Sequence, residues 1–134
     1  MTAREEALAL FQKCRKLELA DGHNGFVQCP YCRRWIRVED SVAVHYIPRQ
    51  FRALEMEPKN VYAGCSSCNG ADQLESNAGA MHERYRQWLI DSYGEWLALW
   101  LENRKRVMVK HGTRFYKQSI EEMKAWLRQR KGRG

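Results

Sequence analysis

The sequence predicts an α+β domain in which short strands carry a four-cysteine metal site and helices flank that site on both sides. Two C-x-x-C pairs, at 29–32 and 65–68, lie among strand-like segments, and amphipathic helical patterns precede and follow them. The chain has 134 residues, of which 44% are hydrophobic and 29% charged, and this composition suits one folded domain with one modest core. We divide it into an N-terminal helix (1–20), a zinc-bound core (26–80) and a helical, basic C-terminal part (81–134).

The N-terminal half is expected to contain one helix and several short strands. Thr2 and Glu5 match a capping box, and apolar residues recur at helical spacing after them, so we expect a helix over 3–19. The segment 26–40 is expected to form two short strands around a turn, and 41–47 a further strand.

The C-terminal part is predicted to be helical. The pattern is helical from Met81 to Leu101, and we expect Gly94 to divide it into two helices. A last helix is expected to start at Ser119, with Glu122 completing its cap. The tryptophans within 88–100 recur at helical spacing, which is more typical of a core than of a base-stacking platform.

Positive charge is concentrated in the C-terminal quarter of the chain. The formal net charge is +7, and residues 101–134 hold 11 Lys and Arg against 3 Asp and Glu, a net of +8. Nucleic acid is the obvious partner for such a segment, and a solvated, partly disordered tail is the alternative. The candidate DNA-binding residues of this segment are Arg104, Lys105, Arg106 and Lys110.

The two C-x-x-C pairs predict one shared structural zinc ion. Each pair brings two sulfurs within reach of one ion, and the two pairs complete a tetrahedron of Cys29, Cys32, Cys65 and Cys68. Thiolates are soft ligands, which favours zinc over magnesium or calcium. The alternatives are a redox-active C-x-x-C or four unconnected core thiols, but the βαβ context of a thioredoxin-like site is absent. The fifth cysteine, Cys14, is expected to be a small core residue of the first helix.

A histidine lies between the two cysteine pairs. Taken alone, His45 on its predicted strand would be an ordinary, half-buried side chain. A neutral imidazole can, however, take a proton from water near neutral pH, which makes His45 a candidate general base. Arg49 follows it as a candidate phosphate clamp, with a plain surface arginine as the alternative, and Arg52 is a further candidate for DNA contact.

The order of these elements resembles the HNH, or ββα-metal, endonucleases, and within them the NinG/Rap recombination proteins of lambdoid phages. After the first C-x-x-C pair, the resembling residues are His45-Tyr46-Ile47-Pro48, Asn60-Val61, Cys65 to Asn69, Ser76-Asn77, Tyr85-Arg86, Leu89 and Tyr93-Gly94. The resemblance implies a treble-clef-like ββα-metal (HNH) core flanked by N- and C-terminal helices. Many HNH enzymes carry Asp or His directly before the catalytic histidine, where this chain has Val44.

The resemblance implies a metal-dependent endonuclease that hydrolyses DNA phosphodiesters, with branched recombination intermediates such as Holliday junctions and D-loops as substrates. His45 is then the general base, and Asn69 offers its side-chain oxygen to a catalytic magnesium or manganese ion. Asn77 and Asp72 are the next candidate ligands of this ion. Asn60 is assigned to the site as a loop clamp whose side chain bonds the backbone near the histidine.

Two alternatives stay open: a non-catalytic zinc-containing module that binds DNA or RNA, and a zinc-stabilised protein-interaction module. The pairing of His45 with Asn69 separates the enzyme from both, because a binding module needs neither residue in this role. No apolar run approaches the roughly 18 residues of a spanning helix, and acidic residues stand where a signal peptide has basic ones. We therefore expect no membrane partner and a cytoplasmic location, which is the host cytoplasm for a phage-encoded protein. A homodimer is a further assembly to consider.

Overall fold

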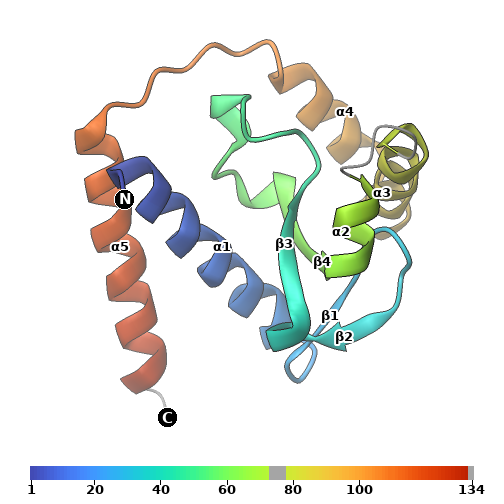
Figure 1. The fold of residues 1–134 in the computed structure, drawn as a ribbon, viewed down its shortest axis with the longest axis horizontal. Coiled ribbons are helices and arrows are strands. Elements are labelled where there is room, and N and C mark those ends of the chain that lie inside the picture. The colour runs from blue at the N-terminus through green and yellow to red at the C-terminus, as the bar shows by residue number, and fades with distance from the viewer. Residues whose placement is uncertain (73–77, 133–134) are drawn as a thin grey trace.

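The computed structural model describes residues 1–72 and 78–132 and shows an α+β architecture (Figure 1). The helices are α1 (Ala3–Asp21), α2 (Ser66–Asp72), α3 (Ala78–Tyr93), α4 (Glu95–Arg104) and α5 (Thr113–Gly132). The strands are β1 (Phe26–Gln28), β2 (Trp35–Arg37), β3 (Ser41–His45) and β4 (Val61–Cys65). The predicted α+β class is therefore confirmed.

Helix α1 begins where its capping signal predicts. The Thr2 hydroxyl accepts a hydrogen bond from the Glu5 backbone N–H at 3.1 Å, and the Glu5 carboxylate accepts one from the Thr2 backbone N–H at 3.4 Å. The helix ends at Asp21, two residues beyond the expected boundary, and Asn24 then turns the chain with a φ of 53°. The apolar face of α1 packs against β3, β4 and β1, so this helix covers one side of both sheets.

The strands form two separate antiparallel pairs. β1 pairs with β2 from Phe26↔Arg37 to Gln28↔Trp35, as the sequence predicts. β3 pairs with β4 from Ser41↔Cys65 to His45↔Val61. The long connection 46–60 between them contains two single-turn 3₁₀ helices, at Arg52–Leu54 and Pro58–Asn60. Because β4 runs directly into α2, the last residues of β4 and the first turn of α2 have fixed positions beside the start of β3.

Helices α3 and α4 lie on the opposite side of the strands from α1 (Figure 1) and contribute six of the fourteen buried residues of the main core cluster. Gly94 divides them as predicted, and its φ of 104° lies in a region that side chains other than glycine rarely adopt. Tyr85 of α3 lies at the centre of an aromatic cluster, and its hydroxyl donates a 2.8 Å hydrogen bond to the Val44 carbonyl of β3. The rings around it are Tyr31, Tyr46, Tyr62 and Trp88. The expectation of core tryptophans holds for Trp88 but is wrong for Trp96, whose side chain is 57% exposed.

The prediction for the last helix was wrong, because α5 begins at Thr113 and not at Ser119. The Ser119 hydroxyl does not cap a helix start; it donates to the Phe115 carbonyl at 3.0 Å, one turn earlier within the helix. The preceding turn is helical because Tyr116 and Ile120 are buried against Ala7 of α1. The C-terminal segment is therefore not a solvated tail over 113–132.

Helices α1 and α5 lie side by side and run in the same direction at one edge of the molecule (Figure 1). Near their C-terminal ends, the Arg130 guanidinium donates two hydrogen bonds to the Asp21 carboxylate, at 2.6 and 2.8 Å. The segment 105–112 crosses the molecule from the end of α4 to the start of α5 (Figure 1). None of the helices in the described part of the chain is long and apolar enough to cross a membrane.

We predict that the α1–α5 contact contributes substantially to stability. Ile120→Ala should lower the free energy of unfolding by about 2–5 kcal/mol, because it leaves a cavity beside Ala7 and Tyr116. Denaturant unfolding followed by circular dichroism measures the change. Lys117→Ala, an exposed residue on the same helix, is the control and should change the free energy by less than about 0.5 kcal/mol. Equal effects of the two substitutions would show that α5 does not dock on α1 through this cluster.

Candidate functional site

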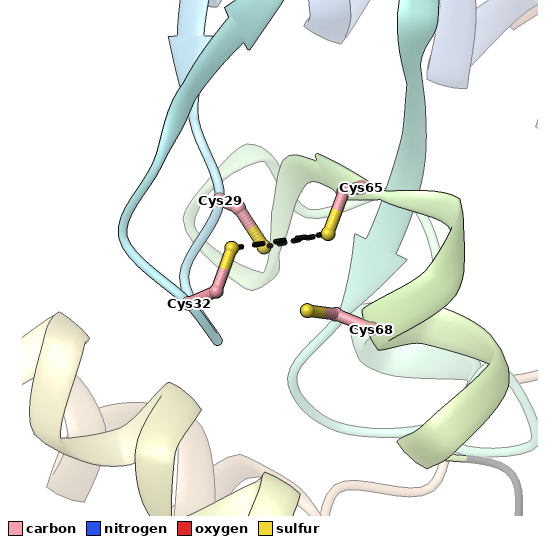
Figure 2. A group of neighbouring side chains, drawn as sticks. All are labelled: Cys29, Cys32, Cys65 and Cys68. Atoms are coloured by element: carbon pink, nitrogen blue, oxygen red, sulfur yellow. Dashed lines mark hydrogen bonds between the residues drawn. The ribbon is translucent and has the colours of Figure 1, made fainter.

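Four cysteines from separate parts of the chain converge on one point (Figure 2). Cys29 follows β1 and Cys32 lies in the turn before β2, whereas Cys65 ends β4 and Cys68 lies in the first turn of α2. The Sγ atoms of the four residues all lie within 4.8 Å of one another. The Sγ of Cys65 is 3.7 Å from that of Cys29 and 3.8 Å from that of Cys32.

These distances match a tetrahedral metal site. Zinc–thiolate bonds of about 2.3 Å in a tetrahedron place neighbouring sulfurs about 3.8 Å apart. Neither pair forms a disulfide, so all four cysteines are free to ligate. The cluster can therefore hold a metal ion, and four soft thiolates in a closed tetrahedron suit zinc best.

The backbone brings the two cysteine pairs together closely. In the first pair the turn closes with hydrogen bonds between the backbone groups of Cys29 and its successors, and Arg33 takes a left-handed φ of 64° to complete it. Gly64 on β4 passes directly beside this turn. A side chain on Gly64 would meet the Cys29 sulfur and the Pro30 ring at 3.4 Å. These are ordinary van der Waals distances, so β4 packs against the first pair at Gly64, directly before Cys65.

The thiols differ in how readily they ionise. Burial raises the pKa of Cys29. Burial also opposes ionisation of Cys65, but hydrogen bonds from the thiol of Cys68 and the hydroxyl of Ser67 outweigh it and lower the pKa of Cys65 to about 6. The Arg34 guanidinium, whose Nε lies 3.5 Å from the Cys32 sulfur, lowers the pKa of Cys32 against the effect of burial. Cys65 is thus prepared to bind metal as a thiolate near neutral pH, and the lowered pKa of Cys32 favours the same form.

His45 ends β3, away from the cysteines, and its ring is held in one orientation. Its Nε2 lies 2.9 Å from the backbone carbonyl oxygen of Glu55. A carbonyl only accepts, so Nε2 carries the proton and donates it, and in the neutral ring Nδ1 is left with a lone pair. No described residue forms a hydrogen bond with Nδ1. Burial, assisted by the positive charge of Arg49, lowers the pKa of His45 below 6.5 and keeps the ring neutral at neutral pH.

The Asn60 side chain forms hydrogen bonds with the backbone of the same connection, 46–60, to which it belongs. The side chain is fully buried; its Oδ1 accepts from the Ile47 N–H at 2.8 Å, and its Nδ2 donates to the carbonyls of Ile47 at 2.9 Å and Leu54 at 3.0 Å. These bonds are those of a loop clamp that holds the backbone of Ile47, two residues after His45 in sequence. They leave Asn60 without access to solvent, so its side chain acts on the backbone and not on a substrate.

Glu55 joins three parts of the chain at one buried carboxylate, which is 1% exposed. Arg4 of α1 donates to it from Nε at 3.0 Å and from Nη2 at 2.8 Å. The Tyr116 hydroxyl of α5 donates to its other oxygen at 2.6 Å. Because the carbonyl of the same residue accepts from His45, the position of the imidazole depends on both terminal helices. Sequence reasoning missed Glu55, Arg4 and Tyr116, which carry no local motif.

Only some of the candidate ligands of a catalytic magnesium lie within the described residues. Asn69 lies half-buried on α2. Asp72 ends α2, but its side chain, like the whole of Asn77, lies outside the described residues. Within the described residues the four cysteines form the only group of three or more His, Cys, Asp or Glu side chains that could hold a metal ion. Val44 is buried in the core at 1% exposure, and its apolar side chain offers no ligand atom to a metal ion.

The predicted DNA-binding residues occupy two regions. Arg49 and Arg52 are exposed on the connection 46–60. Arg104 lies over the Trp100 ring at 4.8 Å, and Lys105 lies over the Phe51 ring at 5.0 Å. The Arg104 contact is within α4, whereas the Lys105 contact brings the end of α4 close to the connection that carries Arg49 and Arg52. Arg106 and Lys110 are exposed on the crossing segment that follows α4.

We predict that the purified protein holds about one tightly bound zinc ion per chain. Cys32→Ser should lose most of that zinc and unfold or aggregate, because three thiolates no longer close the tetrahedron. Elemental analysis after dialysis, together with thermal unfolding, measures both effects. Cys14→Ser is the matched control, since Cys14 is half-buried on α1 outside the cluster, and it should keep its zinc. A stable wild-type protein without zinc would contradict the prediction.

We also predict that Asn60→Ala destabilises the protein without removing zinc. The substitution leaves buried groups of Ile47 and Leu54 without partners, at about 1–3 kcal/mol for each such group. Denaturant unfolding of the zinc-loaded protein gives the change. Asn103→Ala, an exposed asparagine on α4, should leave the free energy of unfolding within about 0.5 kcal/mol of wild type. An Asn60→Ala variant as stable as this control would rule out the clamp.

Comparison of the chain with protein-family models, with curated proteins and with solved structures found no match. Its function is therefore inferred from two features of its own residues: the four-cysteine cluster and the oriented imidazole of His45.

Proposed function

We propose that this protein is a metal-dependent DNA endonuclease of the HNH type. The observation that carries the proposal is the orientation of His45: Nε2 donates to a backbone carbonyl and Nδ1 keeps its lone pair. Such a bond satisfies the N–H of any buried imidazole, and it also gives the ring a fixed tautomer. A general base needs one, because its accepting nitrogen must be free and must point in a constant direction.

The proposed hydrolysis of the phosphodiester begins at Nδ1 of His45. Nδ1 of His45 takes a proton from a water molecule whose oxygen attacks the phosphorus, and the bond from phosphorus to the leaving sugar oxygen breaks. A bound magnesium or manganese ion would stabilise the charge on the phosphate and on the leaving oxygen. Asn69, with Asp72 and Asn77, would supply oxygen ligands for that ion. Since the pKa of His45 lies below 6.5, its ability to accept a proton persists at neutral pH and is lost as the pH falls through that lowered pKa.

The order of the elements supports the same proposal. An antiparallel pair, β3 and β4, leads directly into α2, His45 ends the first strand, and the cysteine pairs lie next to the start of β3. This order resembles the ββα-metal core. Branched recombination intermediates are the proposed substrates on the strength of the NinG/Rap resemblance alone, and the basic residues near Phe51 and on 104–110 support DNA as the polymer.

A non-catalytic zinc module that binds nucleic acid is the second candidate. It is favoured by the absence of any cluster of acidic side chains around His45 within the described residues, and by the burial of Val44 at the position where many HNH enzymes place a ligand. Such a module would keep the zinc, the basic surface and the fold, and would lose nothing if His45 were replaced.

The two candidates predict different results for His45→Ala. For a nuclease, the rate of magnesium-dependent cleavage of a four-way junction should fall by about 10²–10⁴-fold, because the proton acceptor is gone. Zinc content and affinity for the same junction without magnesium should stay close to wild type. Gel analysis of cleavage products under single-turnover conditions gives the rate, with linear duplex as a second substrate.

His23→Ala is the matched control for this experiment. His23 is an exposed imidazole whose ring lies tilted against Trp35 outside the site, and its loss should leave the cleavage rate unchanged. If His45→Ala cleaves as fast as His23→Ala, His45 is not the base. Junction binding without cleavage by the wild-type protein, with either metal, would favour the binding module.

A further inference from the structure

A polar hollow lies between the first half of α1 and the start of the connection 46–60. Its volume is about 620 Å³. The polar side chains of its lining are Arg4, Glu5, Gln12, Arg49, Gln50 and Arg52. Three guanidinium groups thus face one carboxylate across a space open to solvent.

The single carboxylate is already engaged elsewhere. Glu5 accepts the hydrogen bond from the Thr2 N–H that completes the capping box of α1. Arg49 and Arg52 are exposed, and neither forms an ion pair with a described residue. Glu5 keeps its charge and Glu55 pairs with Arg4, so the three arginines of the hollow exceed the two carboxylates beside them by one positive charge.

One of the three arginines is fixed in place. Arg4 uses Nε and Nη2 for the buried Glu55 carboxylate and also interacts with Tyr116, and these contacts hold the plane of the guanidinium. A fixed guanidinium loses little conformational entropy when it binds an anion. The amide groups of Gln12 and Gln50 add neutral donors to the same wall.

The hollow is coupled to His45 in two ways. The charge of Arg49 acts on the imidazole closely enough to perturb its protonation. Glu55 holds Arg4 by its carboxylate and His45 by its carbonyl, so one residue sets both positions. His45 itself is not part of the lining, so an anion in the hollow lies beside the imidazole and not on it.

We propose that this hollow binds a backbone phosphate of a nucleic-acid strand, and that this phosphate is a neighbour of the one presented to His45. Guanidinium groups match phosphate oxygens in pairs, and the volume leaves room for the sugars on either side of the phosphate. The first half of the proposal stands without any catalysis, and the second half rests on the proposed nuclease. The hollow then fixes the register of the strand relative to the histidine.

Two measurements without divalent metal test the site, using wild type and the double variant Arg49→Gln/Arg52→Gln. Inorganic phosphate at constant ionic strength should raise the thermal unfolding midpoint of wild type, and the double variant should lose most of that rise. For a duplex oligonucleotide, the plot of log affinity against log salt should become shallower by about one unit per phosphate contact removed. Both arginines are exposed, so the variant is expected to fold.

Arg128→Gln is the matched control. Arg128 is exposed on α5 near Arg130, which pairs with Asp21 at the far end of α1 from the hollow. It should keep the wild-type response to inorganic phosphate. Equal responses of wild type and the double variant, or an equal loss in Arg128→Gln, would overturn the phosphate site. Because cleavage plays no part in either measurement, an inactive protein that responds as expected would refute the nuclease and leave the phosphate site standing.

Discussion

Four sulfur atoms within 4.8 Å of one another are the constraint on which the central part of this structure depends. Thiolates at such distances repel one another unless a cation lies between them, so the arrangement is stable only with protons or a metal in place. The strands that carry them are short, three residues in β1 and β2 and five in β3 and β4. Such strands bury little apolar surface by themselves, and a zinc ion would join the β1–β2 turn to the β4–α2 junction directly.

The buried carboxylate of Glu55 joins separate segments at the periphery of the molecule, as the cysteine cluster does at the centre. A buried charge is tolerated only when it is paired and hydrogen-bonded, and Arg4 and Tyr116 provide both from opposite ends of the sequence. The connection 46–60 is therefore held from outside by α1 and α5 and from inside by Asn60. The imidazole of His45 takes its orientation from this connection, and through Glu55 it depends on both terminal helices.

The cysteine cluster and the Glu55 network hold different parts of the structure in place. The cysteines fix where β3, β4 and α2 lie, and the Glu55 network fixes how His45 is presented. Basic side chains lie on the connection that follows His45 and along the segment after α4, which suits binding of a polyanion. A nuclease and a nucleic-acid-binding module would share the zinc and the charge, and they differ in whether the oriented imidazole acts on the bound strand.

The sequence by itself determined the features that depend on neighbouring residues. The capping box of α1, the break at Gly94 and the metal-ligand spacing of the cysteines all follow from residues a few positions apart, because caps, turns and C-x-x-C pairs are local. Only the tertiary structure decided the early start of α5, where packing of Tyr116 against α1 extends the helix beyond its apparent cap at Ser119. It also decided the burial of Val44 and the network around Glu55. The partners in that network are up to 61 residues apart, and no local pattern encodes a contact that exists only once the helices have packed.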